Sequence, residues 1–191
     1  MPRFLCGRDV GRGVIAALTG TPGVGKTTVA RGLEKKGFDV LDLHEMVDRE
    51  GLATGRDDER DTLEVDMDAL KDSVLHWRKE RDGDTGVVEG HLSHLMPVDR
   101  IIVLRLNPAQ LSVRLISRGW KPEKVKENCE AEAVDVILIE SVRSGCPVDE
   151  LDGTNLSPEE VVRSVEMILE DAPGTHPPGG VDWSGEVMDW Y

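Results

Sequence analysis

Short apolar runs alternate with segments of helical periodicity along most of this 191-residue chain. Between the runs, apolar residues recur three or four positions apart, as they do on one face of a helix. The alternation predicts an α/β fold around a five-stranded, mostly parallel sheet. The runs with the length and composition of buried strands are 13–19, 37–43, 85–89, 100–106 and 147–151.

Residues that start or stop helices bound the segments between these strands. Asp66 is placed to cap a helix that runs to about residue 81, and Trp77 lies on its apolar face, where we expect core packing rather than nucleotide stacking. Ser157 and Glu160 have the spacing of a capping box. The other helices are predicted at 25–36, 108–118, 122 to about 142, and 158–170.

The pattern divides the chain into three parts. Residues 1–12 predict an irregular lead-in, and 13–171 form one domain, in which the charged segment 44–65 reads as an exposed insertion. The remaining 172–191 are rich in proline and glycine but hold three of the seven aromatic residues. A disordered segment rarely concentrates aromatics, so we expect this tail to clasp its own domain or a partner, its own domain being favoured.

The net charge of the chain limits the classes of molecule that it can bind. Acidic residues outnumber basic ones by 37 to 23, which leaves a net charge of −14. Such a surface repels nucleic acid in general, and we expect no sequence-specific binding to it. Many carboxylates with few lysines are also typical of proteins adapted to high intracellular salt, as in a halophilic archaeon. The alternative is an ordinary acidic cytosolic protein.

The chain carries no pattern of export or membrane insertion. No signal peptide is evident, and the longest apolar stretches have only the length of a strand. The cysteines Cys6, Cys129 and Cys146 are scattered without disulfide or metal-ligand spacing, which suits a reducing compartment. We therefore expect a soluble cytoplasmic monomer with no membrane partner.

Residues 20–28 fit the glycine-rich pattern that cradles nucleotide phosphates. Gly23 and Gly25 let the backbone curl so that its N–H groups face the anion. Lys26 is placed to reach the β- and γ-phosphates, and the hydroxyl of Thr27 to complete the shell of Mg²⁺. A strand is predicted before the loop and a helix after it, which is the context that the motif requires.

An acid and two histidines follow the strand at 85–89. Glu89 ends this strand, at the edge where parallel sheets bind ligands, so it is a candidate partner of Mg²⁺ or water; the alternative is a buried acid that caps the next turn. His91 is a candidate to orient water or carry a proton, with a structural role as the alternative. His94 lacks the further ligands that a zinc pair with His91 would need.

Two groups of arginines are candidates for binding phosphate. Arg114 and Arg118 lie four apart on one predicted helix, before a break at 119–122, and together they could clamp a transferring phosphoryl group. The alternative is a pair of solvated surface arginines. Arg49, Arg56 and Arg60 in the insertion are candidates to bind the phosphate of an acceptor nucleotide.

These motifs together resemble the atypical adenylate kinase family known as isoenzyme 6, in its archaeal form. The resemblance covers most of 13–170 and rests on the segments 19–28, 55–61, 89–94 and 114–120. It implies a three-layer P-loop NTPase fold of the nucleoside monophosphate kinase type. It also implies a short nucleotide-monophosphate insertion near 42–65 and a lid near 117–127.

The family's binding residues carry over onto matching positions. The resemblance implies that Arg118 contacts ATP from the lid and that Glu89 and His91 form an acid-x-His motif that supports ATP hydrolysis. Glu89 stands where eukaryotic relatives have Asp, which leaves direct and water-mediated contact with Mg²⁺ both open. Arg49 matches the arginine that holds AMP only loosely. The residues that would bind the ATP phosphates are Gly23, Gly25, Lys26, Thr27 and Thr28.

The expected activity is transfer of the γ-phosphoryl group of MgATP to AMP, giving two ADP, with weak ATPase activity. The resemblance also implies a role in maturation of the small ribosomal subunit through a ribosomal protein of its platform, a basic partner that would suit this acidic chain. A competing hypothesis is an assembly factor that ATP switches, with incidental kinase activity. The loop 152–155 is the candidate for the adenine side of the site.

The acidic composition generates a prediction about salt. If the surface is adapted to high salt, the midpoint of thermal unfolding should rise as KCl increases from about 0.1 to about 3 M, because ions screen the repulsion among the carboxylates. Calorimetry across this series measures the midpoint. A midpoint that does not rise would identify an ordinary acidic protein.

Overall fold

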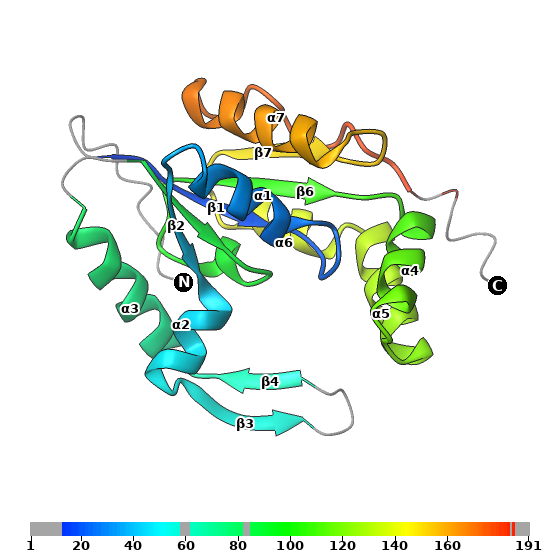
Figure 1. The fold of residues 1–191 in the computed structure, drawn as a ribbon, viewed down its shortest axis with the longest axis horizontal. Coiled ribbons are helices and arrows are strands. Elements are labelled where there is room, and N and C mark those ends of the chain that lie inside the picture. The colour runs from blue at the N-terminus through cyan, green and yellow to red at the C-terminus, as the bar shows by residue number, and fades with distance from the viewer. Residues whose placement is uncertain (1–12, 58–61, 82–84, 184, 186–191) are drawn as a thin grey trace.

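A computed structural model describes residues 13–57, 62–81, 85–183 and 185 of the chain. Its centre is a five-stranded sheet in the order β2-β5-β1-β6-β7, in which every pairing is parallel (Figure 1). The predicted α/β fold and its parallel sheet are therefore confirmed. The strands are β1 (Ile15–Thr19), β2 (Asp39–Asp42), β5 (Gly86–Glu89), β6 (Arg100–Arg105) and β7 (Val148–Asp152).

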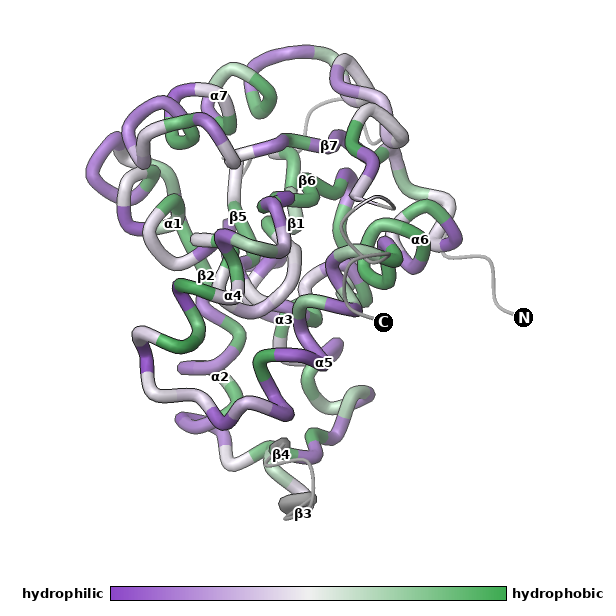
Figure 2. The backbone as a smooth tube through the Cα atoms, turned by 90° about the vertical axis from the view of Figure 1, so that its right-hand side faces the viewer, coloured by the Kyte–Doolittle hydropathy of each residue, from purple (hydrophilic) through white to green (hydrophobic). Residues whose placement is uncertain are grey.

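Helices cover both faces of the sheet. Along β1, Ala16 and Leu18 face one hydrophobic core, and Ile15 and Ala17 face the other. The first core is shared with α1 (Lys26–Glu34) and α7 (Pro158–Glu170), and the second with α2 (Leu43–Glu50), α3 (Met67–Lys79) and α6 (Val136–Arg143). Burial on both faces explains why the central strands β1, β5 and β6 are mainly apolar, whereas the edge strands β2 and β7 also carry several acids (Figure 2).

The helix predicted from 122 to about 142 is wrong as a single element. Helix α5 (Pro122–Ala133) ends two residues before Asp135, whose φ of 59° is left-handed, and α6 starts at the next residue. Asp tolerates this conformation better than most residues. Its carboxylate accepts a hydrogen bond from Arg105 at 2.5 Å, which helps to hold the turn. The break redirects the chain so that Leu138 enters the second core.

The insertion at 44–65 is less exposed at its start than predicted. Helix α2 buries Met46 and Val47 against the second core, so the expectation of an exposed segment is wrong for this helix. A short antiparallel hairpin follows, formed by β3 (Ala53–Asp57) and β4 (Thr62–Val65). This amphipathic helix could not be predicted, because its charged sequence contains too few apolar residues at helical spacing. The hairpin and the pair formed by α4 (Pro108–Ser117) and α5 extend from the body on two sides of the β1–α1 loop (Figure 1).

Side-chain caps fix where several helices begin. Asp42 accepts hydrogen bonds from the first amides of α2, and Asp66 does the same for α3. Asn107 caps α4 (Pro108–Ser117), and the predicted capping box of Ser157 and Glu160 is formed at α7. Trp77 is only 8% exposed and lies in the second core, as predicted.

The described part of the tail runs beside the edge strand β7. The backbone N–H groups of Gly174 and His176 donate to Asp149, and those of Gly179 and Gly180 donate to Glu150. The backbone N–H of Glu150 also donates to the carbonyl oxygen of His176 at 2.8 Å, so the tail covers part of a strand edge that would otherwise be open to pairing. Trp190 and Tyr191, two of the expected aromatic anchors, lie outside the described residues. None of the helices in the described ranges is long and apolar enough to cross a membrane.

Candidate active site

The loop between β1 and α1 has the shape of an anion cradle. Gly23 and Gly25 have φ values of +100° and +120°, which residues with a side chain rarely adopt. A Cβ atom on Gly23 would also lie 2.7 Å from Cδ2 of Leu115, so the loop packs closely on α4. Gly25 is the N-cap of α1 and supplies no side-chain cap. The N-terminal end of α1, with its partial positive charge, therefore points into the loop.

Lys26 is buried at the first position of α1, with 7% of its surface exposed. Its Nζ atom donates to the carbonyl oxygens of Gly20 at 2.8 Å and Thr21 at 3.2 Å. Burial lowers the pKa of Lys26 to about 8, although the carboxylates of Glu89 and Glu132 oppose this shift. A bound phosphate chain would give this ammonium group a negatively charged partner in direct contact.

Oxygen ligands gather at the carboxyl ends of β2 and β5. Glu89 is 5% exposed, and its Oε1 atom lies 3.5 Å from Oγ1 of Thr27. Asp42 is its register partner on β2, and burial, followed by the negative charge of Asp42, raises the pKa of Glu89 above its ordinary value. A hydroxyl and two neighbouring carboxylates are donors that fit Mg²⁺, and a cation would relieve their repulsion.

Asp42 was not among the residues singled out from the sequence. The signal was present, because Asp42 is an acid at the end of a predicted strand, as Glu89 is. Its N-cap role at α2 also explains the residue type, so the position alone would not have shown a second role.

The two histidines after β5 have different surroundings. Partial burial, followed by the charge of Lys26, lowers the pKa of His91 to about 4. The imidazole is therefore neutral near pH 7. Part of the residue is still exposed to solvent. His94 is buried, with Nδ1 3.1 Å from Oγ1 of Thr19 and Nε2 3.0 Å from Oε2 of Glu140. His94 thus ties β1 to α6, whereas His91 is available to a ligand.

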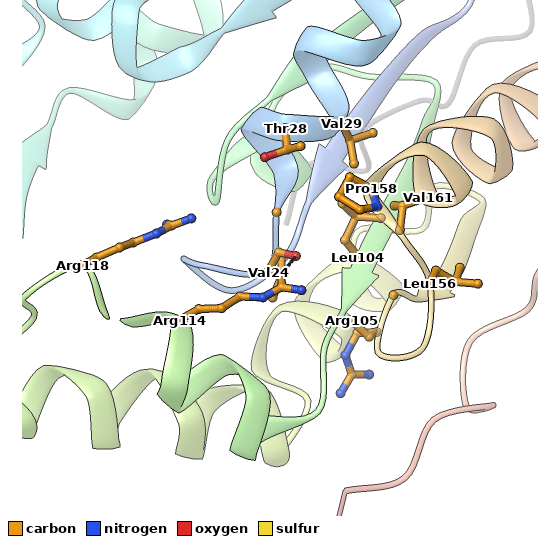
Figure 3. A pocket seen from close by; sticks show the side chains of 12 residues that line it. Val24, Thr28, Val29, Leu104, Arg105, Arg114, Arg118, Leu156, Pro158 and Val161 are labelled. Carbon is orange, nitrogen blue, oxygen red and sulfur yellow. Dashed lines mark hydrogen bonds between the residues drawn. The ribbon is translucent and has the colours of Figure 1, made fainter. Parts of the chain in front are cut away.

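Arg114 and Arg118 line one side of a cavity of about 250 Å³ beside the phosphate loop (Figure 3). Nη1 of Arg114 donates to the carbonyl oxygen of Val24 at 3.0 Å, which fixes this guanidinium against the loop. Burial, followed by the charge of Arg118, lowers the pKa of Arg114. Neither arginine has a salt bridge to an acid in the described ranges, so their charges favour an anion in the cavity.

The opposite wall of this cavity is mainly apolar. Gly153 belongs to the loop 152–155, the candidate for the adenine side of the site. Positive charge on one side and apolar surface on the other suit a ligand with a phosphate chain and a flat base. The other residues on this wall are Leu104, Leu156, Pro158 and Val161.

Of the candidate acceptor arginines, Arg49 is not among the described residues that line this cavity. Arg49 lies on α2 with 65% of its side chain exposed, and it pairs with the adjacent Glu50 at 3.0 Å. Arg56 belongs to β3. Arg60 lies outside the described residues. The structure thus brings Lys26 and the candidates on β5 and α4 around the phosphate loop, while these arginines belong to the separate insertion.

Comparison with known proteins places this chain in a family. The family described as AAA domain matches residues 17–135. A protein of Archaeoglobus fulgidus named "Putative adenylate kinase" is 41% identical over 179 residues, which cover 92% of this chain and 95% of that protein. A protein of the same name from Pyrococcus furiosus is 45% identical over 178 residues, covering 93% and 91% of the two chains.

A solved structure supports the fold alone. The shikimate kinase of Acinetobacter baumannii, in complex with shikimate, superposes with a TM-score of 0.56 at 15% identity. The superposition covers 84% of this chain and 94% of that one. At this identity the similarity supports the α/β fold but gives no information about the substrate.

The buried His94 generates a prediction about acid stability. Burial lowers the pKa of His94 below its ordinary value of 6.5, although Glu140 opposes the shift. The unfolded chain therefore binds this proton more tightly, and the stabilisation is complete above about pH 6.5 and is lost as the pH falls toward the folded-state value. His94→Gln should reduce the slope with which the unfolding free energy falls as the pH is lowered, by up to about 1.4 kcal/mol per pH unit.

Urea unfolding between about pH 7 and about pH 5 measures this slope. His76→Gln is the matched control, because the His76 side chain is 77% exposed and near the end of α3. Equal slopes for the unaltered protein and His94→Gln would contradict the assignment.

Proposed function

The chain belongs to the AAA domain family and, as its motifs predicted, to the family of these archaeal adenylate kinase relatives, and from this premise we propose that it transfers the γ-phosphoryl group of MgATP to AMP. The observation that carries the proposal is the cavity in which Arg114 and Arg118 face the phosphate loop. Cations on two sides of a phosphate chain can stabilise the charge that spreads over the transferring group.

Each group around the loop has a distinct part in this proposal. Lys26 binds the β- and γ-phosphates in place of the carbonyl oxygens that it contacts in this structure. Thr27 and Glu89 hold Mg²⁺, directly or through water, with Asp42 beside them. When bound, the metal neutralises phosphate charge and orients the chain. Thr28, which lines the same cavity, contacts the phosphates from the first turn of α1.

Weak ATP hydrolysis would arise when water replaces the acceptor. His91 is neutral near pH 7, so it can accept a hydrogen bond from water beside the phosphates. Closure of the lid near 117–127 over the cavity would exclude water and favour transfer to AMP. Arg49, Arg56 and Arg60 remain the candidates that hold the AMP phosphate.

Lys26→Met tests the assignment of the phosphate site. The methionine keeps an unbranched apolar stem but removes the charge, so ADP formation from ATP and AMP should fall at least about a hundredfold, and phosphate release without AMP should fall with it. A coupled assay with a panel of monophosphates measures both rates and ranks the acceptors.

Lys36→Met is the matched control for this variant. Lys36 lies just beyond the other end of α1 and pairs with Glu166 at 2.6 Å, away from the loop. Its removal should leave both rates unchanged. Unaltered activity in a folded Lys26→Met protein would refute the site, and no ADP from the unaltered protein with any monophosphate would refute the function.

A second candidate function is favoured by the net charge of −14. An acidic surface attracts a basic protein, and we propose that ATP turnover switches affinity for a basic ribosomal protein of the small subunit. The two functions can coexist, because one nucleotide site would serve both.

The switch predicts that affinity for this ribosomal protein depends on the bound nucleotide. Binding should be several-fold different with a non-hydrolysable ATP analogue and with ADP, because only differential affinity can shift a conformational equilibrium. Titration at one fixed ionic strength separates this effect from simple charge attraction. Equal affinities in all nucleotide states would exclude the switch.

A further inference from the structure

A buried carboxylate on α5 forms a hydrogen bond to the side chain of Thr21 in the phosphate loop. Glu132 is 3% exposed, and its Oε2 atom accepts a hydrogen bond from Oγ1 of Thr21 at 2.5 Å. Its Oε1 atom accepts from Nε of Arg105 at 2.7 Å and from the backbone N–H of Leu106 at 3.2 Å. One side chain thus joins three segments: the loop, the end of β6 and α5.

Thr21 is the part of the loop on which Lys26 rests. Its carbonyl oxygen accepts from Nζ of Lys26 and also from the N–H of Val24. The residue itself is 2% exposed. Pro22 restricts the backbone directly after Thr21, but Gly20 and Gly23 on either side of this pair leave the loop free to turn. A bond that fixes the Thr21 side chain therefore also fixes the carbonyl that positions the ammonium group.

Arg105 is among the residues that line the cavity, but its guanidinium is bound to Glu132. Its guanidinium points away from Arg114 and Arg118 (Figure 3). It donates to Asp135 and to Glu150 at 2.5 Å each, and also to the backbone carbonyl of Glu132 at 3.0 Å. With three carboxylates around it, this guanidinium is satisfied within the protein and is not a phosphate ligand.

We propose that Glu132 is a positioning residue, which acts through Thr21 to hold the phosphate loop in the shape that binds MgATP. This inference rests on the proposed function and deepens it. The competing explanation is that Glu132 only balances the buried charge of Arg105, which would make it a stability residue. Glu150 balances the same guanidinium but has no described bond to the loop, so the two explanations predict different results.

Thr21→Val and Thr21→Ser separate shape from hydrogen bonding. Valine keeps the volume of threonine but loses the hydroxyl, and leaves Glu132 without one partner. Thr21→Val should weaken binding of a non-hydrolysable MgATP analogue about tenfold, the effect of one hydrogen bond to a charged group. Thr21→Ser keeps the hydroxyl and should restore most of the affinity. In turnover, the KM for ATP should rise while the KM for AMP stays constant.

Glu132→Gln and Glu150→Gln form the matched pair. Each variant removes one of the negative charges that pair with Arg105. Only Glu132→Gln should weaken binding of the analogue, also about tenfold. The double variant Thr21→Val with Glu132→Gln should bind no more weakly than either single variant, because glutamine can form only a weaker, neutral hydrogen bond to Thr21 and both changes act on the same contact. Calorimetric titration measures affinity, and the unfolding midpoint of each variant shows that it is folded at the assay temperature.

Two results would overturn the proposal. One is analogue affinity unchanged by Thr21→Val, and the other is equal loss of affinity in Glu132→Gln and Glu150→Gln. The affinity measurement does not depend on phosphoryl transfer. If the unaltered protein bound the analogue but made no ADP with any monophosphate, the proposed function would fail while the role of Glu132 would still be decided by these variants.

Discussion

The buried charge of Lys26 constrains the arrangement of the candidate site. An ammonium group taken out of water needs compensation from nearby oxygens, and here two loop carbonyls contact it while Glu89 and Glu132 act on it through their charges. None of these contacts is a close ion pair with a carboxylate in the described ranges. The group is therefore held in place but incompletely balanced, which is the state that favours binding of a phosphate anion.

The parallel sheet determines which acids can compensate this charge. Because all five strands run the same way, their carboxyl ends meet at one edge, where the loop after β1 also begins. Register sets Asp42 beside Glu89 across β2 and β5. Residue 105 ends β6 at the same edge, and Arg105 brings Glu132 of α5 toward the loop. The site thus depends on strand order more than on the loop motif alone.

Sequence patterns were informative where a residue's role depends on its neighbours in the chain. The strands, the glycine loop and the capping box of Ser157 and Glu160 could be predicted because period, turn geometry and capping are local. The left-handed turn at Asp135 could not, because the ion pair that stabilises it joins Asp135 to Arg105, 30 positions away. Glu132 was missed for the same reason, since an acid in a charged helix looks like a solvated one.

The contacts of Arg105 also link the loop to the edge of the sheet formed by β7. Glu150 accepts from Arg105 through Oε1 and from the tail amides of Gly179 and Gly180 through Oε2. A chain of bonds therefore runs from the tail through Glu150, Arg105 and Glu132 to Thr21.

Contiguous bonds do not by themselves transmit a signal, because coupling requires an element with two arrangements that both ends can bias. What the chain of bonds does provide is stiffness. Each buried carboxylate in it is held at two atoms, so moving one would leave a desolvated charge unpaired. In the role proposed for Glu132, a loop rich in glycine keeps one shape without a ligand because the ion-pair network that contacts it restricts its movement.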